Sequence, residues 1–178
     1  MAEFIPHCRN LQELYLSKIS LGEQGAKAVA VSAPLCPNLQ TLCINDNAIG
    51  DAGAKALAES ISQCPNLKRL NLRSNSIGAQ GVKAVAQSIS RCPKLENLDL
   101  SCNTISDAGA KALAEFIPRC GNLQWIYLCS AYIGDVGAEA IAQAIPYCLN
   151  IEGVDLEEND LSPNVLFKQS PTLMSYNT

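Results

Sequence analysis

One short pattern, LxxLxLxxN, recurs along this 178-residue chain at a fixed interval of 28 residues. The most complete copy is at residues 67–75, and equivalent apolar positions start at residues 11, 39, 95, 123 and 151. A period between 20 and 50 residues indicates stacked copies of one supersecondary unit, none of which buries its apolar face alone. The sequence therefore predicts a repeat array with six strand segments.

Each full unit predicts a turn, a short strand, a second turn and a helix. In the unit at 36–63, Pro37 and Asn38 favour a turn, and residues 42–44 alternate sides as a strand does. Residues 52–62 have their apolar side chains on one helical face and are rich in Ala and Gly, which let neighbouring helices pack closely. Because helices still need more room than strands spaced about 4.8 Å apart, we expect an α/β solenoid that curves, with a parallel sheet on the concave side.

Two polar residues of the unit are predicted to complete its backbone. Asn47 recurs as Asn75, Asn103 and Asn159, and its amide can satisfy backbone groups of the adjacent turn. Asp51 is a candidate N-cap for the helix at 52–62.

The array is predicted to span residues 1–161, as a half repeat at 1–8, five units and a sixth strand. Residues 1–10 match residues 113–122 at all but three positions, so the chain opens in mid-repeat. This leaves two interpretations: a piece of a longer array, or a minimal cap formed by the opening residues. Residues 162–178 lose the pattern and are expected to be a C-terminal cap and tail, poorly ordered after residue 167.

Six of the nine cysteines share one repeat position. They are Cys8, Cys36, Cys64, Cys92, Cys120 and Cys148. Free cysteine behaves as a small buried apolar residue, and the local CxxC spacing of a metal site is missing. We expect a ladder of reduced, buried thiols, with Cys43 and Cys129 as the most reactive cysteines, although bridges between neighbouring rungs remain an alternative.

Composition narrows the class of function. The net charge is −4, and the Lys and Arg residues are scattered, which disfavours nucleic acid. No apolar run has the length of a membrane span, and residues 1–8 do not resemble a signal peptide, so we expect a cytoplasmic protein or one delivered into a host cytosol. His7 is the single histidine and has no positioned nucleophile, and no phosphate-binding or HExxH motif occurs. We therefore expect no enzyme activity and no cofactor or metal.

The joint pattern LxxLxLxxNxIGxxGAKALAxxI resembles the leucine-rich repeat family, in particular the ribonuclease-inhibitor type shared with Ran GTPase-activating proteins and NOD-like receptors. The resemblance covers residues 1 to about 162. Ile19 and Ala131 depart from it, since they replace the Asn of the turn. The resemblance implies a binding surface on the concave sheet and its adjoining loops.

Outward-facing strand positions differ between units and supply the candidate partner-binding residues. Trp125 is the single tryptophan, and Trp, Tyr and Arg are over-represented in interface hot spots. The candidates are Tyr15, Arg69, Arg73, Asp99, Trp125, Tyr127, Tyr132, Asp155 and Glu157. Alternatively, the aromatic residues only stack along the sheet and the charges are solvated. The convex lysines Lys27, Lys55, Lys83 and Lys111 are a rival surface that we rank lower.

The predicted function is a non-enzymatic module that binds a protein partner on its concave face. Trp125 and Tyr127 are expected to stand together there, flanked by Asp99 and Asp155 on the neighbouring strands. The alternatives are a regulator of a small GTPase, similar to the Ran-activating proteins, and a bacterial or protist effector directed at a host.

Overall fold

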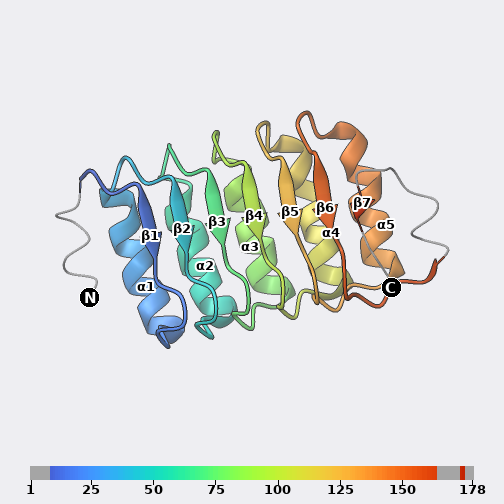
Figure 1. Cartoon of the computed structure of the whole chain (residues 1–178), viewed down its shortest axis with the longest axis horizontal. Helices are drawn as coiled ribbons and strands as arrows, with labels where there is room; N and C mark the ends of the chain where they lie inside the picture. The colour runs from blue at the N-terminus through green and yellow to red at the C-terminus, as the bar shows by residue number, and fades with distance from the viewer. Residues whose placement is uncertain (1–8, 164–172, 175–178) are drawn as a thin grey trace.

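Strands and helices alternate in the computed structural model, which describes residues 9–163 and 173–174 (Figure 1). The repeat strands have three residues each: β1 Glu13–Tyr15, β2 Thr41–Cys43, β3 Arg69–Asn71, β4 Asn97–Asp99, β5 Trp125–Tyr127 and β6 Gly153–Asp155. The helices between them are α1 Gly22–Ser32, α2 Gly50–Ile61, α3 Ala79–Ile89, α4 Ser106–Phe116 and α5 Asp135–Ala144. Short 3-10 helices follow three of them at Ala33–Leu35, Ile117–Arg119 and Ile145–Tyr147.

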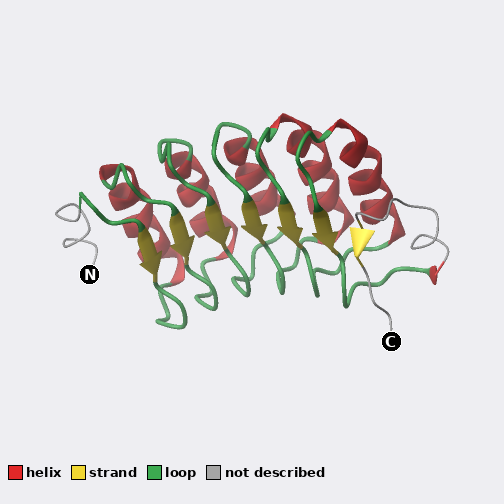
Figure 2. Cartoon of the chain, turned by 45° about the horizontal axis from the view of Figure 1, so that its top comes forward, coloured by secondary structure: helices red, strands yellow, loops and turns green. Residues whose placement is uncertain are grey.

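The strands form one parallel sheet in chain order, and the helices cover one of its faces (Figure 2). Every repeat strand pairs with the next one at a shift of 28 residues, as in the pairing of Leu14 with Leu42 and of Leu42 with Leu70. The predicted α/β solenoid is confirmed. We call the sheet face opposite the helices the concave face and the helical side the convex face.

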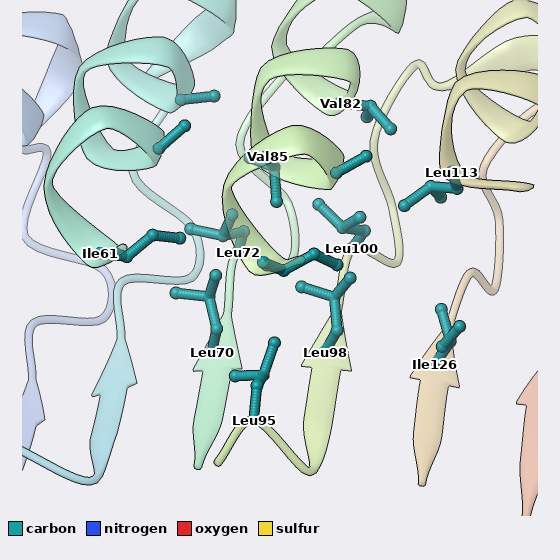
Figure 3. Packing of buried hydrophobic residues seen from close by; sticks show 14 of the residues in the cluster. Ile61, Leu70, Leu72, Val82, Val85, Leu95, Leu98, Leu100, Leu113 and Ile126 are labelled. Carbon is teal, nitrogen blue, oxygen red and sulfur yellow. The ribbon is translucent and has the colours of Figure 1, made fainter. Parts of the chain in front are cut away.

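The repeated leucines form the core between the two layers (Figure 3). In the unit at 67–75, Leu67, Leu70 and Leu72 are buried, as are Val82 and Val85 of α3. In α2, Leu57 is buried and Lys55 is exposed, as the helical period predicts.

The cysteine ladder lies at the C-terminal ends of the helices. Cys36, Cys64, Cys92 and Cys120 are buried, whereas Cys148 is only half-buried. The predicted burial is confirmed for the first four, and it was too strong for Cys148. Cys8 lies outside the described residues. Each thiol points at a helix carbonyl four residues earlier, for example Cys148 Sγ at 3.4 Å from the oxygen of Ala144. The thiols thus pair with carbonyls that a helix end leaves open.

The asparagine ladder joins each turn to the unit before it. Asn103 Oδ1 accepts the N–H groups of Asn75 and Ile77 at 2.9 Å each, and its Nδ2 donates to Leu72 and Leu100 carbonyls at 3.0 and 2.8 Å. The predicted role of this amide is confirmed. Ala131 interrupts the ladder, so the N–H groups of Asn103 and its neighbour Ile105 receive no acceptor from this position.

A second amide ladder runs along the opposite ends of the strands. Asn66 Nδ2 donates to the carbonyl of Pro37 at 2.8 Å, and Asn38, Asn122 and Asn150 make the equivalent bond. Lys94 replaces the amide in one unit and donates instead to Asn66 Oδ1 at 2.6 Å. Both edges of the sheet are therefore tied from unit to unit.

Asp51 does not cap its own helix, and that prediction was wrong. Helix α2 already begins at Gly50, and Asp51 Oδ1 accepts the N–H groups of Gly78 and Gly81 at 2.6 and 3.0 Å, so it caps α3 of the next unit. Asp107 does the same for α5, at Gly134 and Gly137. Asp51 lies 27 residues before Gly78, whereas a helix cap is normally sought within the few residues next to the helix.

The turns before α3 and α5, which an Asp carboxylate holds, differ from the turn before α4, which has none. Gly78, held by Asp51, is extended at φ −98°, and Gly134 is similar. The unit before α4 has Ala79 at the carboxylate position, and there Ser106 takes φ +58° and donates to the Ala131 carbonyl at 3.1 Å. Two turn conformations thus occur in units of equal length.

The C-terminal region departs from the prediction in one respect. Leu173–Met174 forms β7, which pairs in parallel with β6, although no repeat motif marks it and these residues were expected to be poorly ordered. Residues 1–8, 164–172 and 175–178 lie outside the described part, and the predicted half repeat, the opening cap and most of the C-terminal cap fall there.

The amide ladder makes a matched pair of predictions. Asn75→Ala removes the acceptor of the Asn47 N–H and three donated bonds, so the free energy of unfolding should fall by about 3 kcal/mol or more. Ala131→Asn supplies the missing acceptor for Asn103 and Ile105 and should raise it by about 1 kcal/mol. Denaturant unfolding followed by circular dichroism measures both. If both Asn75→Ala and Ala131→Asn had wild-type stability, the amides would not stabilise the array.

The buried thiols make stability depend on alkaline pH. Burial and a neighbouring ladder thiol raise the pKa of Cys64 and Cys92 from 9.0 to about 11, so the folded chain keeps protons that the unfolded chain has lost. Stability is therefore complete below pH 9 and should fall toward pH 11, by about 1.4 kcal/mol per pH unit for each thiol. Denaturant unfolding at several pH values measures this dependence. Between pH 9 and pH 11 the free energy of unfolding should fall less steeply with pH in the double variant Cys64→Ala/Cys92→Ala than in the wild type. Equal slopes would contradict this explanation, because lysine and tyrosine titration is common to both proteins.

Candidate functional site

Equivalent side chains form straight rows across the concave face, because every strand keeps the same register. The third pattern position gives the row Glu13, Thr41, Arg69, Asn97, Trp125 and Gly153. The fifth gives Tyr15, Cys43, Asn71, Asp99, Tyr127 and Asp155. The seventh, just beyond the strands, gives Ser17, Asn45, Arg73, Ser101, Cys129 and Glu157.

Trp125 and Tyr127 form the aromatic centre of the concave face. Their ring centroids lie 6.0 Å apart with an interplanar angle of 16°, so the two rings are stacked. Both residues are half-buried. Trp125 Nε1 donates to Glu152 Oε2 at 3.1 Å, and the ring lies over Gly153, where any side chain would overlap it. The pair is held in place while part of each ring stays exposed, which suits an anchor for a partner.

Asp99 and Asp155 flank Tyr127 on the two neighbouring strands, as predicted. Asp99 Oδ1 accepts the N–H of Ser101 at 2.9 Å, and Asp155 Oδ1 accepts the N–H of Glu157 at 2.9 Å. These carboxylates are therefore fixed by the backbone of their own turns.

A shallow depression, the concave basin, lies beside this pair and crosses four strands. Its lining side chains include Cys43, Arg69, Asn71, Asn97, Asp99 and Tyr127. Burial raises the pKa of the Cys43 thiol, and the charge of Asp99 raises it further, so this thiol is held protonated near neutral pH. The basin offers amide, carboxylate and guanidinium groups beside an aromatic wall, which favours a polar side chain of a partner.

Arg69 and Arg73 are exposed at the edge of the basin and in the turn after β3. In the described part of the chain, ion pairs join Lys27 to Glu23 and Lys68 to Glu96, and neither arginine takes part in one. Both guanidinium groups are thus available to an acidic group of a partner.

Two candidate residues lie away from the aromatic centre. Tyr15 is on β1, four strands from Tyr127, and its hydroxyl donates to Glu13 at 3.2 Å. Tyr132 is 73% exposed in the turn after β5, beside Ser130 and Glu158. Ser130 and Cys129 donate to the Glu158 carboxylate and hold its pKa below the usual range.

Sequence reasoning missed the residues that position the tryptophan. Glu152 precedes its strand and so lies outside the outward-facing strand positions, and Gly153 was not among the candidate residues. A glycine in a row that otherwise has side chains, next to the single tryptophan, is the signal that could have indicated a covered backbone. Cys43, Asn71 and Asn97 also line the basin, although they were not among the selected candidates.

No group of three or more His, Cys, Asp or Glu side chains among the described residues is arranged to hold a metal ion. No helix in the same residues has the length and apolar character needed to cross a membrane.

Comparisons with known proteins agree with the repeat pattern. A family model described as "Leucine Rich repeats (2 copies)" matches residues 37–84, and one described as "Leucine Rich repeat" matches residues 91–114. The sequence matches no curated protein.

Two solved structures have a similar fold. One is leiomodin-1 actin-binding site 2, with a TM-score of 0.68 and 12% identity over 82% of this chain and 86% of that one. The other is the tropomodulin C-terminal domain of Caenorhabditis elegans, with a TM-score of 0.68 and 14% identity over 82% and 89% of the two chains. At this level of identity the likeness concerns the fold alone.

The covered glycine predicts a spectroscopic effect. Gly153→Ala places a methyl group against the Trp125 ring, so the ring should move off the strand into solvent and the emission of this single tryptophan should shift to longer wavelength. Gly121→Ala is the control, because an added methyl there has no neighbour within 4 Å. An unchanged emission spectrum for Gly153→Ala would show that the ring does not rest on β6 in solution.

Proposed function

Because this chain is a leucine-rich repeat protein, we propose that it is a non-enzymatic module that binds a protein partner on its concave face. Leucine-rich repeat domains are protein–protein interaction modules, and the arrangement of Trp125 and Tyr127 supports the choice of face most strongly. The stacked rings are held by Gly153 and Glu152 before any partner arrives, so little side-chain entropy is lost on binding. The size of the face also fits, since six strands span about 25 Å, which is enough for a standard interface of about 800 Å² per partner.

The partner is not inferred from the similar structures. The leiomodin-1 chain is described as an actin-binding site, which is one protein-binding use of a similar fold. An identity of 12% does not extend that partner to this chain. Regulation of a small GTPase and action as a host-directed effector draw on no particular feature of the described residues, so we do not propose them.

Two finer assignments are also proposals. The strand-to-helix pattern favours the ribonuclease-inhibitor type of repeat. A reducing cytoplasm is proposed as the compartment, because the buried cysteine ladder suits free thiols.

Trp125→Ala is expected to weaken binding of a partner captured with the intact chain by at least about 2 kcal/mol, or roughly 30-fold, because it removes an aromatic anchor. Titration calorimetry with the purified partner measures the loss. Since Trp125 also packs on Gly153, the fold of the variant should be checked by circular dichroism.

Lys55→Ala on α2 is the matched control, because Lys55 is exposed on the convex face and should not affect affinity. If instead Trp125→Ala left the affinity unchanged and Lys55→Ala lowered it, the binding site would lie on the convex face.

A further inference from the structure

Charge is unevenly distributed along the array. Residues 120–163 contain seven acidic residues and no Lys or Arg. These are Asp135, Glu139, Glu152, Asp155, Glu157, Glu158 and Asp160. The last basic residue before this segment is Arg119, so the positive charge of the described array lies in the units that precede it. The C-terminal third of the array is therefore acidic, and it carries the aromatic centre.

On the concave face this division separates two groups of opposite sign. Arg69 and Arg73 belong to the third unit, and Asp155 and Glu157 belong to the sixth. Arg73 and Glu157 occupy the same row, and β3 and β6 are three strand spacings apart. At about 4.8 Å per spacing, the backbones that carry the two groups lie roughly 14 Å from each other.

The turns that carry these two charges have the same construction. Asn71 Oδ1 accepts the N–H of Arg73 at 3.0 Å, and Asp155 Oδ1 accepts the N–H of Glu157 at 2.9 Å. The two backbones are fixed in the same way, so the separation between the two backbone positions is set by the repeat. The stacked rings of Trp125 and Tyr127 on β5 lie between them, and the concave basin extends from Cys43 on β2 to Tyr127 on β5.

We propose that the concave face binds an extended segment of a partner protein that crosses the strands and carries charges of both signs. This rests on the function proposed above and specifies the partner. An Asp or Glu of the segment pairs with Arg69 and Arg73, and a Lys or Arg beside an apolar residue lies at the aromatic pair, near Asp155 and Glu157. An extended chain advances about 3.3 Å per residue, so about four residues separate the two charged positions of the segment.

Each group contributes a different part of the recognition. The stacked rings supply apolar area and a face for a cation, whereas the charged groups select the sequence and its direction along the array. A segment with the opposite order of charges would place like charges together at both ends. The inference therefore specifies the order of the charges in the bound segment: its acidic residue lies at β3 and its basic residue lies at β6.

A library of displayed random 12-residue peptides, selected on the intact chain, tests this. The enriched peptides should share an acidic residue and a Lys or Arg three to five residues apart, with an apolar residue next to the cation. The consensus peptide, labelled with fluorescein, is then titrated by fluorescence polarisation. Its charge-exchanged counterpart, with the acidic and basic residues swapped, should bind more weakly.

Neutral isosteres of the protein test the two charged groups separately. Asp155→Asn/Glu157→Gln and Arg69→Gln/Arg73→Gln should each weaken the consensus peptide about threefold or more at low salt. Asn71 already holds the equivalent turn with an amide, so Asp155→Asn should keep the fold. Lys55→Gln on the convex face should leave the affinity unchanged.

The outcomes separate this inference from the proposed function. An absence of enriched peptides, a consensus without the charge pair, or full affinity in both isostere variants would overturn the inference. If Trp125→Ala still weakens a captured protein partner, the concave face remains the binding surface without an extended segment of this kind. If Trp125→Ala has no effect on any bound partner or peptide, both proposals are wrong.

Discussion

Most units of this array depend on the next unit to complete their buried turn. The N–H groups of Asn75 and Ile77 are buried, and their acceptor is the side chain of Asn103, one unit later. A buried N–H without an acceptor costs about 1–3 kcal/mol, so stacking is a requirement of the backbone as well as of the leucine core. The fixed 28-residue register follows, since an amide shifted by one residue would no longer reach the turn.

The same register also determines how side chains are arranged on the concave face. Once strands are locked in step, an outward position of one unit stands beside its equivalents in all others, and the binding chemistry depends only on which residue each unit places there. Trp125 stands next to Gly153 for this reason, and Tyr127 stands between Asp99 and Asp155. The regular core thus permits an irregular surface without any change of backbone.

The period alone predicted the features that repeat. Leu70 and Leu98 had to be inward and Asn75 had to serve a turn, because one explanation had to hold for every unit. Features that join particular units were not predictable in this way. Asp51 resembles a local cap in sequence, yet its carboxylate accepts the N–H of Gly78 in the next unit. The turn takes another conformation at Ser106, where Ala79 stands at the position of Asp51. The strand at 173–174 has no repeat motif, so only the tertiary structure identifies it.

The one-way order of the amide ladder has a consequence for biosynthesis. A ribosome releases the chain from its N-terminus, and domains fold as they emerge. The turn around Asn75 receives its acceptor only when Asn103 has left the exit tunnel. The hydrogen bonds of such a turn are therefore completed only after one further repeat has been synthesised. The nascent protein should therefore grow by addition at one end, with the newest unit always incomplete. At Ala131 the side-chain acceptor is missing, so the unit before it receives only backbone acceptors from the next repeat, such as the Ala131 carbonyl that accepts the Ser106 N–H.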